Sequence, residues 1–506
     1  MRYAHEVAVV RAAEQALMAK LPDGTLMQRA ASGLASVCAT LLGPVYGSRV
    51  VVLAGSGDNG GDALYAGARL AGRGAAVTAV AAGPRLHQAG SAELLSRGGR
   101  VTAAVGGADN ASITPAAQSA IARADLIIDG LTGIGGQGGL REPAGALARL
   151  AECARADGAL VVAVDLPSGI DADTGEVHGT AIRADVTVTF GTLKSGLLID
   201  PGASQAGTTE LIGIGLGPYL AEPAVAALQA ADVASILPQP SAETDKYRRG
   251  VLGVVAGSEQ YTGAAVLSVG GAIHGGAGMV RLVSAPVAVN VVRQHWPEAV
   301  LTTYDPSRPD QAVESAGRVQ AWVVGPGIGT GPAAHALLAT VLAANVPVLI
   351  DADGLTVLAA NRDLLPRQAA TLITPHAGEL ARLLGADRDE IEARRLYYAR
   401  AAAAELGVTV LLKGSTTVIA GPGTGQPVLV NPTGSNWLAT AGSGDVLSGL
   451  AGALLAQGAD ARGAAAAAAY LHGMAGRLAA RAAPIGASDL IGAIPAAIRA
   501  VKGNDL

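Results

Sequence analysis

Residues 49–74 read RVVVLAGSGDNGGDALYAGARLAGRG, and this stretch decides the fold of the first part of the chain. An apolar, β-branched run ends at Ala54, a glycine-rich turn follows, and an Ala- and Leu-rich stretch then has helical spacing. A buried strand, a tight turn and a helix in this order are typical of a parallel sheet.

Similar apolar runs that end in glycine-rich loops recur along the first half of the chain. They are DLIIDG from Asp125, LVVAVDLPSG from Leu160 and DVTVTFG from Asp185, with Ala-rich helical stretches between them. Because these runs have no polar alternation, both faces of the sheet must be covered by helices. The pattern predicts an α/β domain over residues 1–220, Rossmann-like and built in three layers.

The alternation of strand-like and helical stretches is interrupted at residues 217–250, where prolines and polar residues gather in GPYLAEPAVAALQAADVASILPQPSAETDKYRRG. We interpret residues 221–245 as a linker. Strand-like runs then resume as VLGVVAG from Val251, VQAWVVGPGIG from Val319, VPVLIDADG from Val346, ATLITPHAGE from Ala370 and VTVLLKGS from Val408. These runs predict a second α/β domain over residues 246–506. Its late stretch GAAAAAAYLHGMAGRLAARAA is expected to be a packed helix, because Ala is the best helix former.

Length and composition exclude several classes of protein. The chain has 506 residues, more than one hydrophobic core supports, which favours two large domains. It has 36 Lys and Arg against 41 Asp and Glu, which excludes a basic nucleic-acid footprint. Half of the residues are hydrophobic, which excludes a disordered chain. We find no uninterrupted apolar run of about 20 residues and no signal-peptide plan at the start, and therefore expect a cytoplasmic protein without a membrane partner. The two cysteines, Cys38 and Cys153, are expected to be small core residues.

The first glycine-rich turn matches G-x-G-x-x-G through Gly55, Gly57 and Gly60, but it departs from a simple dinucleotide fingerprint. The next strand-like run, AAVTAVAAGP, has no acid to hold a ribose, and Asp58 and Asp62 bring carboxylates to the turn. One interpretation is that the glycines only form a turn and Asp62 caps the helix. The other is a site for a cation or hydroxyl groups as well as phosphate.

Three more polar residues, Asp129, Asp165 and Ser168, follow strands at the edge where open parallel sheets bind ligands. Carboxylate, amide and hydroxyl oxygens that converge there could hold a hard cation. The cluster therefore favours a site over a set of isolated turn residues.

Four blocks together resemble the NAD(P)H-hydrate epimerase domain: GDNGGDAL from Gly57, DGLTGIGG from Asp129, VDLPSGIDADTG from Val164 and TFGTLKSGLL from Thr189. They span most of the first 215 residues. The resemblance implies a potassium site at Asn59, Asp129 and Ser168, and places Lys194 in the pocket. It also implies contacts with the hydrated nicotinamide nucleotide by Asp165 and by two loops, Asp58, Asn59, Gly60, Gly61 and Asp62, and Gly133, Ile134, Gly135, Gly136, Gln137, Gly138 and Gly139. Asp58, Ala63 and Ile134 depart from the usual pattern of the family.

Epimerisation at the hydroxylated ring carbon requires loss of water, assisted by the ring nitrogen, and readdition on the other face of a planar cation. A carboxylate can shuttle the protons and stabilise that cation. Asp165 is the candidate, with Lys194 beside it in the implied site. The alternative is that Asp165 only orients a ribose hydroxyl.

A second glycine-rich loop lies in the last quarter, NWLATAGSGDVLSGLAGALLAQG from Asn436. Gly442 to Asp445 is expected to lead into a helix that begins near Val446. Successive N–H groups at a helix N-terminus form an anion hole, and an Asp there can take a proton from an attacking hydroxyl. The alternative, that Asp445 is only an N-cap, does not account for the glycines before it.

This loop resembles the G-[AT]-G-D signature of ribokinase-like kinases. Further blocks are AGSEQYTGAAVLSVGGAIHGGAGMVRL from Ala256, VVGPGIGTG from Val323, IDADGL from Ile350, TPHAGEL from Thr374 and LLKGSTTVI from Leu411. Together they resemble the ADP- or ATP-dependent NAD(P)H-hydrate dehydratase over nearly all of residues 246–500, with a ribokinase-like three-layer fold. The resemblance implies contacts with the hydrated nucleotide by Ala264, Gly327, His376 and Asp445. It implies contacts with the adenine nucleotide by Lys413, Gly414, Ser415, Thr416, Thr417 and Gly444, and magnesium to neutralise the transferred phosphoryl group.

Three of these side chains have plainer interpretations. His376 could be a buried histidine satisfied by the backbone, although its position in a short loop after a strand favours the site. Glu379 could lie near magnesium, but a helix cap is favoured. Lys413 would be an ordinary solvated lysine without its motif.

The leading hypothesis is a bifunctional repair enzyme for hydrated NADH and NADPH, in which the first domain epimerises the R and S forms and the second dehydrates the S form. The alternatives are a ribokinase-like kinase of a small alcohol, and a first domain that only senses nucleotides. The expected partners are these small nucleotides and ADP or ATP, with no nucleic acid, and a homo-oligomer is expected.

Overall fold

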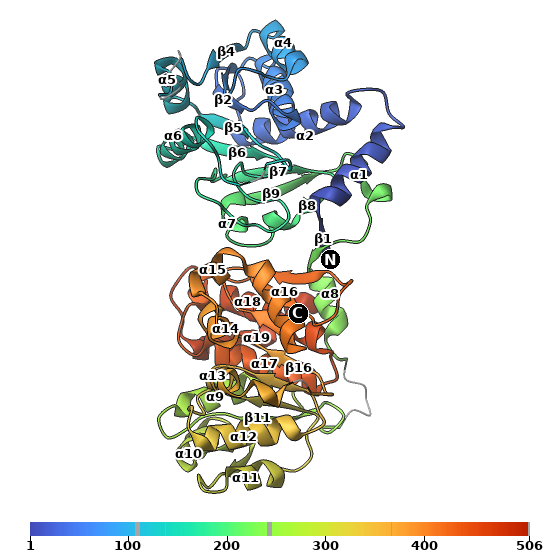
Figure 1. The fold of residues 1–506 in the computed structure, drawn as a ribbon. Coiled ribbons are helices and arrows are strands. Elements are labelled where there is room, and N and C mark those ends of the chain that lie inside the picture. The colour runs from blue at the N-terminus through green and yellow to red at the C-terminus, as the bar shows by residue number, and fades with distance from the viewer. Residues whose placement is uncertain (107–111, 137, 240–244, 366, 504–506) are drawn as a thin grey trace. The chain divides into compact units, whose positions relative to one another are not determined.

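The computed structural model describes residues 1–106, 112–136, 138–239, 245–365 and 367–503. The chain divides into two compact units, Tyr3–Val225 and Ala226–Leu506, with Met1–Arg2 counted in the second (Figure 1). Each unit has buried apolar clusters of its own.

The N-terminal unit contains a seven-stranded sheet in the order β4-β3-β2-β5-β6-β7-β9, and every neighbouring pair is parallel. The strands are β2 (Arg49–Ala54), β3 (Ala76–Ala81), β4 (Arg100–Ala103), β5 (Leu126–Gly130), β6 (Leu160–Val164), β7 (Val186–Phe190) and β9 (Thr208–Ile212). The chain runs outward from β2 to β4 and then returns to the other side of β2 as β5. This reversal between β2 and β5 is the point at which open α/β sheets bind ligands.

Alternate residues of the central strand β2 face opposite layers of helices. Val50 and Val52 belong to a core cluster with α1 (Val7–Met18), α2 (Thr25–Leu42), α3 (Asp58–Ala71) and α4 (Gln88–Ser96). Val51 and Leu53 belong to another, with α5 (Pro115–Ala122) and α6 (Ala144–Ala156). The three layers predicted from the uniformly apolar strands are therefore confirmed. The unit also contains β1 (Arg2–His5), which pairs with β8 (Leu193–Lys194), the short helix α7 (Ala203–Ala206), and two 3-10 helices, η1 (Ser195–Leu197) and η2 (Gly217–Tyr219).

The second unit contains strands in the order β13-β12-β11-β14-β15-β16-β17-β18-β19, followed by β10. They are parallel from β13 to β17, whereas β17, β18 and β19 pair antiparallel. The bounds are β10 (Val225–Ala227), β11 (Val251–Val255), β12 (Met279–Ser284), β13 (Val300–Thr303), β14 (Ala321–Val324), β15 (Val348–Ile350), β16 (Thr371–Ile373), β17 (Thr409–Leu412), β18 (Thr417–Ala420) and β19 (Val428–Asn431). The strand order reverses between β11 and β14.

The helices of the second unit include a group that forms one core cluster with the strands: α8 (Ala230–Ile236), α9 (Thr262–His274), α17 (Ser443–Ala456), α18 (Ala461–Ala480) and α19 (Ala487–Lys502). The alanines at 464–469 of α18 are buried, so the predicted packed helix is confirmed. The others are α10 (Pro286–His295), α11 (Pro309–Ser315), α12 (Pro332–Ala343), α13 (Asp353–Ala360), α14 (Ala377–Leu384), α15 (Arg388–Ala393) and α16 (Arg395–Leu406).

Two sequence interpretations differ from the structure. Part of the proposed linker 221–245 forms β10 and α8, because Val233 and Leu237 bury their side chains in the core of the second unit. Cys38 is buried as expected, but the prediction for Cys153 is wrong because it is exposed on α6.

None of the described helices is long and apolar enough to cross a membrane.

Candidate active sites

A cavity of about 520 Å³ lies at the carboxyl ends of the strands of the N-terminal unit, beside the reversal between β2 and β5. Its walls come from α1, the start of α3 and the loops that follow β5 and β6, and Phe190 of β7 completes them. Of the predicted residues, the lining includes Asp58, Asn59, Asp62, Gly133, Ile134, Gly135, Gly136 and Asp165.

The first glycine-rich loop turns directly into α3, whose N-cap is Gly57. A methyl group at Gly60 would lie 2.3 Å from the carbonyl oxygen of Gly55, so only glycine allows the helix to start this close to the turn. Gly60 and Gly61 are buried beneath the cavity wall. Asp62 lies inside the helix and is not its cap. Its Oδ1 is buried and has no hydrogen-bond partner among the described residues, and burial, with the charges of Asp165 and Asp58, raises its pKa well above the ordinary value.

The second loop of the site follows β5. Gly133 to Gly136 line the cavity, Gln137 lies outside the described residues, and Gly138 and Gly139 are not in the lining. A methyl group at Gly139 would lie 1.6 Å from the carbonyl oxygen of His178, so this residue packs against backbone. The structure thus brings the first half of the predicted loop to the cavity.

The three residues of the implied potassium site lie around the backbone of Thr132. Asp129 is fully buried; its two carboxylate oxygens accept hydrogen bonds from Ser168 Oγ at 2.7 Å and Ser168 N at 2.8 Å. Asn59 Nδ2 donates to the Thr132 carbonyl at 2.9 Å. Burial raises the pKa of Asp129 to about 6, and no Lys or Arg forms an ion pair with it in the described part of the chain. A buried carboxylate among amide, hydroxyl and carbonyl oxygens is a donor set that suits a hard cation.

Asp165 follows β6 with a φ of +68°, a strained conformation for a residue with a side chain, and such strain gathers at functional sites. Lys194 Nζ, which is almost completely buried, forms a very short contact with Asp165 Oδ1 and donates to Thr189 Oγ1 and the Phe190 carbonyl, both at 3.1 Å. Asp165 Oδ1 also accepts from Phe190 N at 3.2 Å. Among the described residues, each hydrogen bond that the Asp165 side chain accepts falls on Oδ1, so Oδ2 is the oxygen left for a ligand.

A cavity of about 660 Å³ lies in the second unit, between the loop after β17 and the N-terminus of α17. The predicted residues in its lining are His376, Lys413, Gly414, Ser415, Thr417, Gly444 and Asp445. Helix α17 begins at Ser443, earlier than predicted, because Gly442 turns the chain with a φ of +85°. Gly444 and Asp445 therefore lie in the first turn of the helix.

Lys413 is the centre of the charge network in this cavity. Its Nζ donates to Asp351 Oδ1 at 2.7 Å and lies 3.7 Å from Glu379 Oε2. Burial alone would lower the pKa of Lys413, but the charges of Asp351 and Glu379 outweigh it and raise the pKa. Burial, followed by the charge of Asp351, raises the pKa of Asp445 to about 7. The carboxylate of Asp445 accepts no hydrogen bond in the described part of the chain, which leaves it free to take a proton.

His376 is exposed and forms the N-cap of α14, so the buried-histidine interpretation is wrong. Its Nδ1 accepts from Gly378 N at 3.0 Å and Glu379 N at 3.2 Å, which leaves the proton of a neutral ring on Nε2. Glu379 Oε2 accepts from His376 N at 2.8 Å and so completes a capping box with His376, which is the capping role that the sequence favoured for Glu379.

Three predicted residues lie outside the lining of this cavity: Ala264, Gly327 and Thr416. The first two are neighbours, since a methyl group at Gly327 would lie 2.8 Å from Ala264 Cβ. Gly414 does line the cavity, and a methyl group there would lie 1.4 Å from Arg395 Nη2. The buried Arg395 side chain therefore requires glycine in this loop.

Family models match both units. A model of NAD(P)H-hydrate dehydratase matches residues 252–495, and a model described as YjeF-related protein N-terminus matches residues 23–196. The bifunctional NAD(P)H-hydrate repair enzyme Nnr of Mycobacterium leprae is 47% identical over 486 residues, covering 95% of this chain and 94% of that protein. The chain belongs to the bifunctional NAD(P)H-hydrate repair enzyme family. The Nnr protein of Corynebacterium glutamicum is 36% identical, with 90% and 88% covered.

Solved structures resemble the second unit of this family member. The ADP/ATP-dependent NAD(P)H-hydrate dehydratase of Bacillus subtilis, co-crystallised with ATP and Mg²⁺, has a TM-score of 0.50 and 30% identity, and covers 54% of this chain and 97% of its own. A ribokinase-like superfamily protein of Enterococcus faecalis, with a TM-score of 0.50, 24% identity and coverage of 56% and 98%, shows the same fold. The predicted ribokinase-like fold is therefore confirmed.

Several lining residues were missed by the sequence argument. In the second cavity they include Asp351, a strand-end acid inside the quoted IDADGL block, and His472 in the Ala-rich helix α18. His472 Nε2 lies 2.9 Å from the Ser443 carbonyl, and burial lowers its pKa to about 4. In the first cavity they include Leu131, Thr132 and Phe190 inside the quoted blocks, and four residues of α1, which no motif marked.

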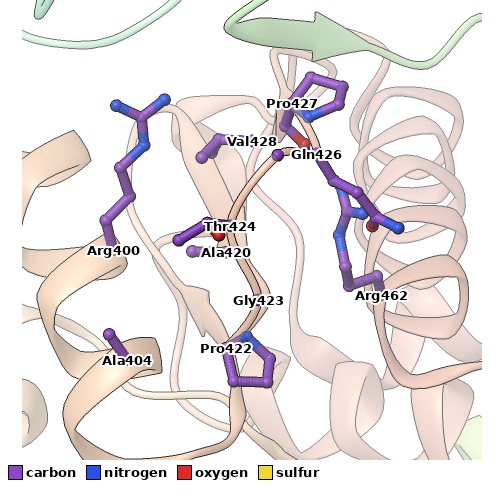
Figure 2. Close-up of a pocket in the computed structure, with 12 residues that line it drawn as sticks. Arg400, Ala404, Ala420, Pro422, Gly423, Thr424, Gln426, Pro427, Val428 and Arg462 are labelled. Atoms are coloured by element: carbon purple, nitrogen blue, oxygen red, sulfur yellow. The ribbon is translucent and has the colours of Figure 1, made fainter.

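A further hollow of about 560 Å³ lies at residues 421–427, the loop that joins β18 and β19 (Figure 2). Arg400 of α16 and Arg462 of α18 stand on opposite sides of this loop. No residue that the sequence predicted for a site lines it.

Proposed function

We propose that the chain repairs hydrated NADH and NADPH in two steps: the N-terminal unit interconverts the R and S epimers, and the second unit dehydrates the S epimer with ADP or ATP. The observation that carries this proposal is the Asp445 carboxyl group in the first turn of α17, which accepts no hydrogen bond from the described residues and lines a cavity together with Lys413 and Asp351. The names of the relatives and of the Bacillus dehydratase support it.

Dehydration needs a better leaving group than hydroxide. Asp445 takes the proton of the ring hydroxyl while the hydroxyl oxygen attacks the terminal phosphoryl group of the nucleotide. The bond to the rest of the nucleotide breaks, and the nucleotide leaves with one phosphate fewer. N–H groups at the start of α17 and the Lys413 ammonium stabilise the charge that develops on the phosphoryl oxygens. The ring nitrogen then expels phosphate, and loss of a ring proton regenerates NAD(P)H.

Magnesium is expected with the nucleotide, as in the co-crystals of the Bacillus protein. The cavity suits a hard cation carried by the nucleotide, because its lining includes the carboxylates of Asp351 and Glu392 in addition to that of Asp445, which the mechanism keeps for the proton. When bound, the ion would neutralise charge on the phosphate groups.

Epimerisation is assigned to Asp165 and Lys194. The Lys194 ammonium holds Asp165 Oδ1, so that Oδ2 can deliver a proton to the ring hydroxyl, which leaves as water, and can take a proton back from the water that adds. The same carboxylate stabilises the planar cation that remains, and water then adds to its other face. If Asp165 only orients a ribose hydroxyl, its replacement will weaken binding and leave the maximal rate unchanged.

Potassium is proposed at Asn59, Asp129 and Ser168, on the strength of the buried carboxylate and the surrounding oxygens. A bound cation there would hold the loop that begins at Thr132 in one conformation. A homo-oligomer and a cytoplasmic location are also proposed.

The experiment that tests the function uses the full chain, both NADH hydrate epimers, ATP and magnesium, and follows dihydronicotinamide absorbance and free phosphate. Recovery of NADH with one phosphate released per turnover is expected. A stable phosphorylated product would instead favour the small-alcohol kinase that family membership argues against. If only one epimer is consumed rapidly, the first unit is no epimerase and the nucleotide-sensor interpretation takes its place.

A further inference from the structure

One face of α1 forms a wall of the N-terminal cavity. Arg11, Glu14, Gln15 and Met18 line it, and their spacing of three and four residues puts them on one side of the helix. The opposite side, with Val10, Ala13 and Leu17, packs into the core. Helix α1 ends before residue 23, where the match to the family model begins, so nothing in that match accounts for this polar face.

The charges that line the cavity are unbalanced. Glu14, Asp58, Asp62 and Asp165 provide four carboxyl groups, whereas Arg11 is the sole Lys or Arg in the described lining. Lys194 lies behind Asp165 and already donates to three oxygens. A nicotinamide dinucleotide carries a negatively charged pyrophosphate, which the ionised carboxylates of this lining would repel. Arg11 is the basic side chain of the described lining that can offset this repulsion.

The position of Arg11 suits this task. A methyl group at Gly135 would lie 3.1 Å from Arg11 Nη2, so the guanidinium lies against the backbone of the glycine loop that follows β5. Arg11 forms no ion pair in the described part of the chain. The start of α1 is held in place because Val7 N donates to Asp173 Oδ1 at 2.7 Å.

We propose that Arg11 binds the phosphate groups of the hydrated nucleotide, and that α1 is a substrate-binding element of the N-terminal site. This inference rests on the proposed epimerase function. It also fixes the direction of the substrate: the phosphates lie between Arg11 and the glycine loop, and the hydrated ring lies at the carboxylate end, near Asp165. A planar guanidinium suits phosphate because it can donate two parallel hydrogen bonds.

The test measures epimerisation by the full chain without ADP or ATP, so that no dehydration occurs. The substrates are hydrated NADH, which has a pyrophosphate, and hydrated dihydronicotinamide riboside, which has the same reduced ring and no phosphate. We expect Arg11→Gln to raise KM for hydrated NADH by about 10- to 100-fold, as for loss of a hydrogen bond to a charged group, with kcat little changed. Arg11→Lys should recover part of the loss, and Arg73→Gln, at an exposed arginine of the same unit, should change nothing.

For the riboside, Arg11→Gln should leave KM unchanged, a result that a general loss of structure would not give. An unchanged KM for hydrated NADH in Arg11→Gln, beside an active parent protein, would overturn the proposal for Arg11 alone. Equal losses of activity on both substrates would also overturn it, because the effect would then not depend on phosphate. No epimerisation by the parent protein would refute the proposed function itself.

Discussion

The raised pKa of Asp445 gives a prediction about the pH dependence of dehydration. Since this pKa is about 7 and the base must be ionised, about half of the enzyme is competent at pH 7 and about one tenth at pH 6. The rate with the S epimer should therefore fall tenfold per pH unit below about 7 and reach a plateau above it. An ordinary aspartate would give a plateau down to about pH 4.

The variant Asp351→Asn tests whether the charge of Asp351 contributes to the raised pKa of Asp445. Asp351 Oδ2 and Lys413 Nζ would lie 3.8 and 3.5 Å from a methyl group at Gly444, the residue before Asp445. Removing the Asp351 carboxylate ends a repulsion and leaves Lys413 free to attract Asp445, and both effects lower the pKa of Asp445. Burial still raises the pKa of Asp445 in this variant, so we expect a shift of about one unit, at the low end of what a nearby charge produces. At pH 6 a shift of one unit raises the ionised fraction from about one tenth to about one half.

The assay is kcat/KM against pH with purified S epimer, ATP and magnesium, read as NADH formed. The terminal phosphate of ATP also titrates near pH 6, but its pKa belongs to the nucleotide and cannot follow a change at Asp351. Asp445→Asn should lose about 10²- to 10⁴-fold in rate, and Asp310→Asn, at an exposed carboxylate of the same unit, should lose none. If the acidic limb stays in place in Asp351→Asn, or lies near pH 4 in the parent, Asp445 is not the base described.

Three other outcomes are expected. Potassium chloride, compared with choline chloride, should raise the unfolding temperature of the N-terminal unit, and should do so less in Ser168→Ala; equal shifts would argue against the site. Lys194→Met should lower the free energy of unfolding of that unit by about 3–5 kcal/mol in denaturant titrations, because the Asp165 carboxylate is then buried without its partner. The double variant Lys194→Met with Asp165→Asn should lose less. A fragment of residues 226–506 should be more stable than one of 240–506 by at least about 3 kcal/mol, since the shorter one lacks the apolar side chains of α8; equal denaturation midpoints would contradict this.

The strands and both glycine-rich turns could be predicted because their signals are local. A run such as RVVVLAG at Arg49 has no polar side, and only a strand covered on both faces uses such a run. Because the carboxyl ends of parallel strands share one edge, Asp129, Asp165 and Ser168 could be expected near each other before any coordinate was known. The segment before residue 246 was harder, because its prolines mark a linker while the apolar spacing in AVAALQAADVASIL forms β10 and α8.

The residues that were missed are those whose partners are distant in the sequence. A helix face made of Arg11, Glu14, Gln15 and Met18 looks like an ordinary solvated face, and only the fold shows that it borders a cavity. His472 is a single histidine in an Ala-rich helix, and its link to the GSGD loop spans 29 residues. Strand-end acids such as Asp129 and Asp165 could be found from the sequence because the sheet fixes where they lie, and Asp351, although missed, carries the same signal after β15. Side chains that reach a site from a covering helix depend instead on how that helix packs. Arg11 is therefore the more demanding test of the substrate direction proposed for the N-terminal unit.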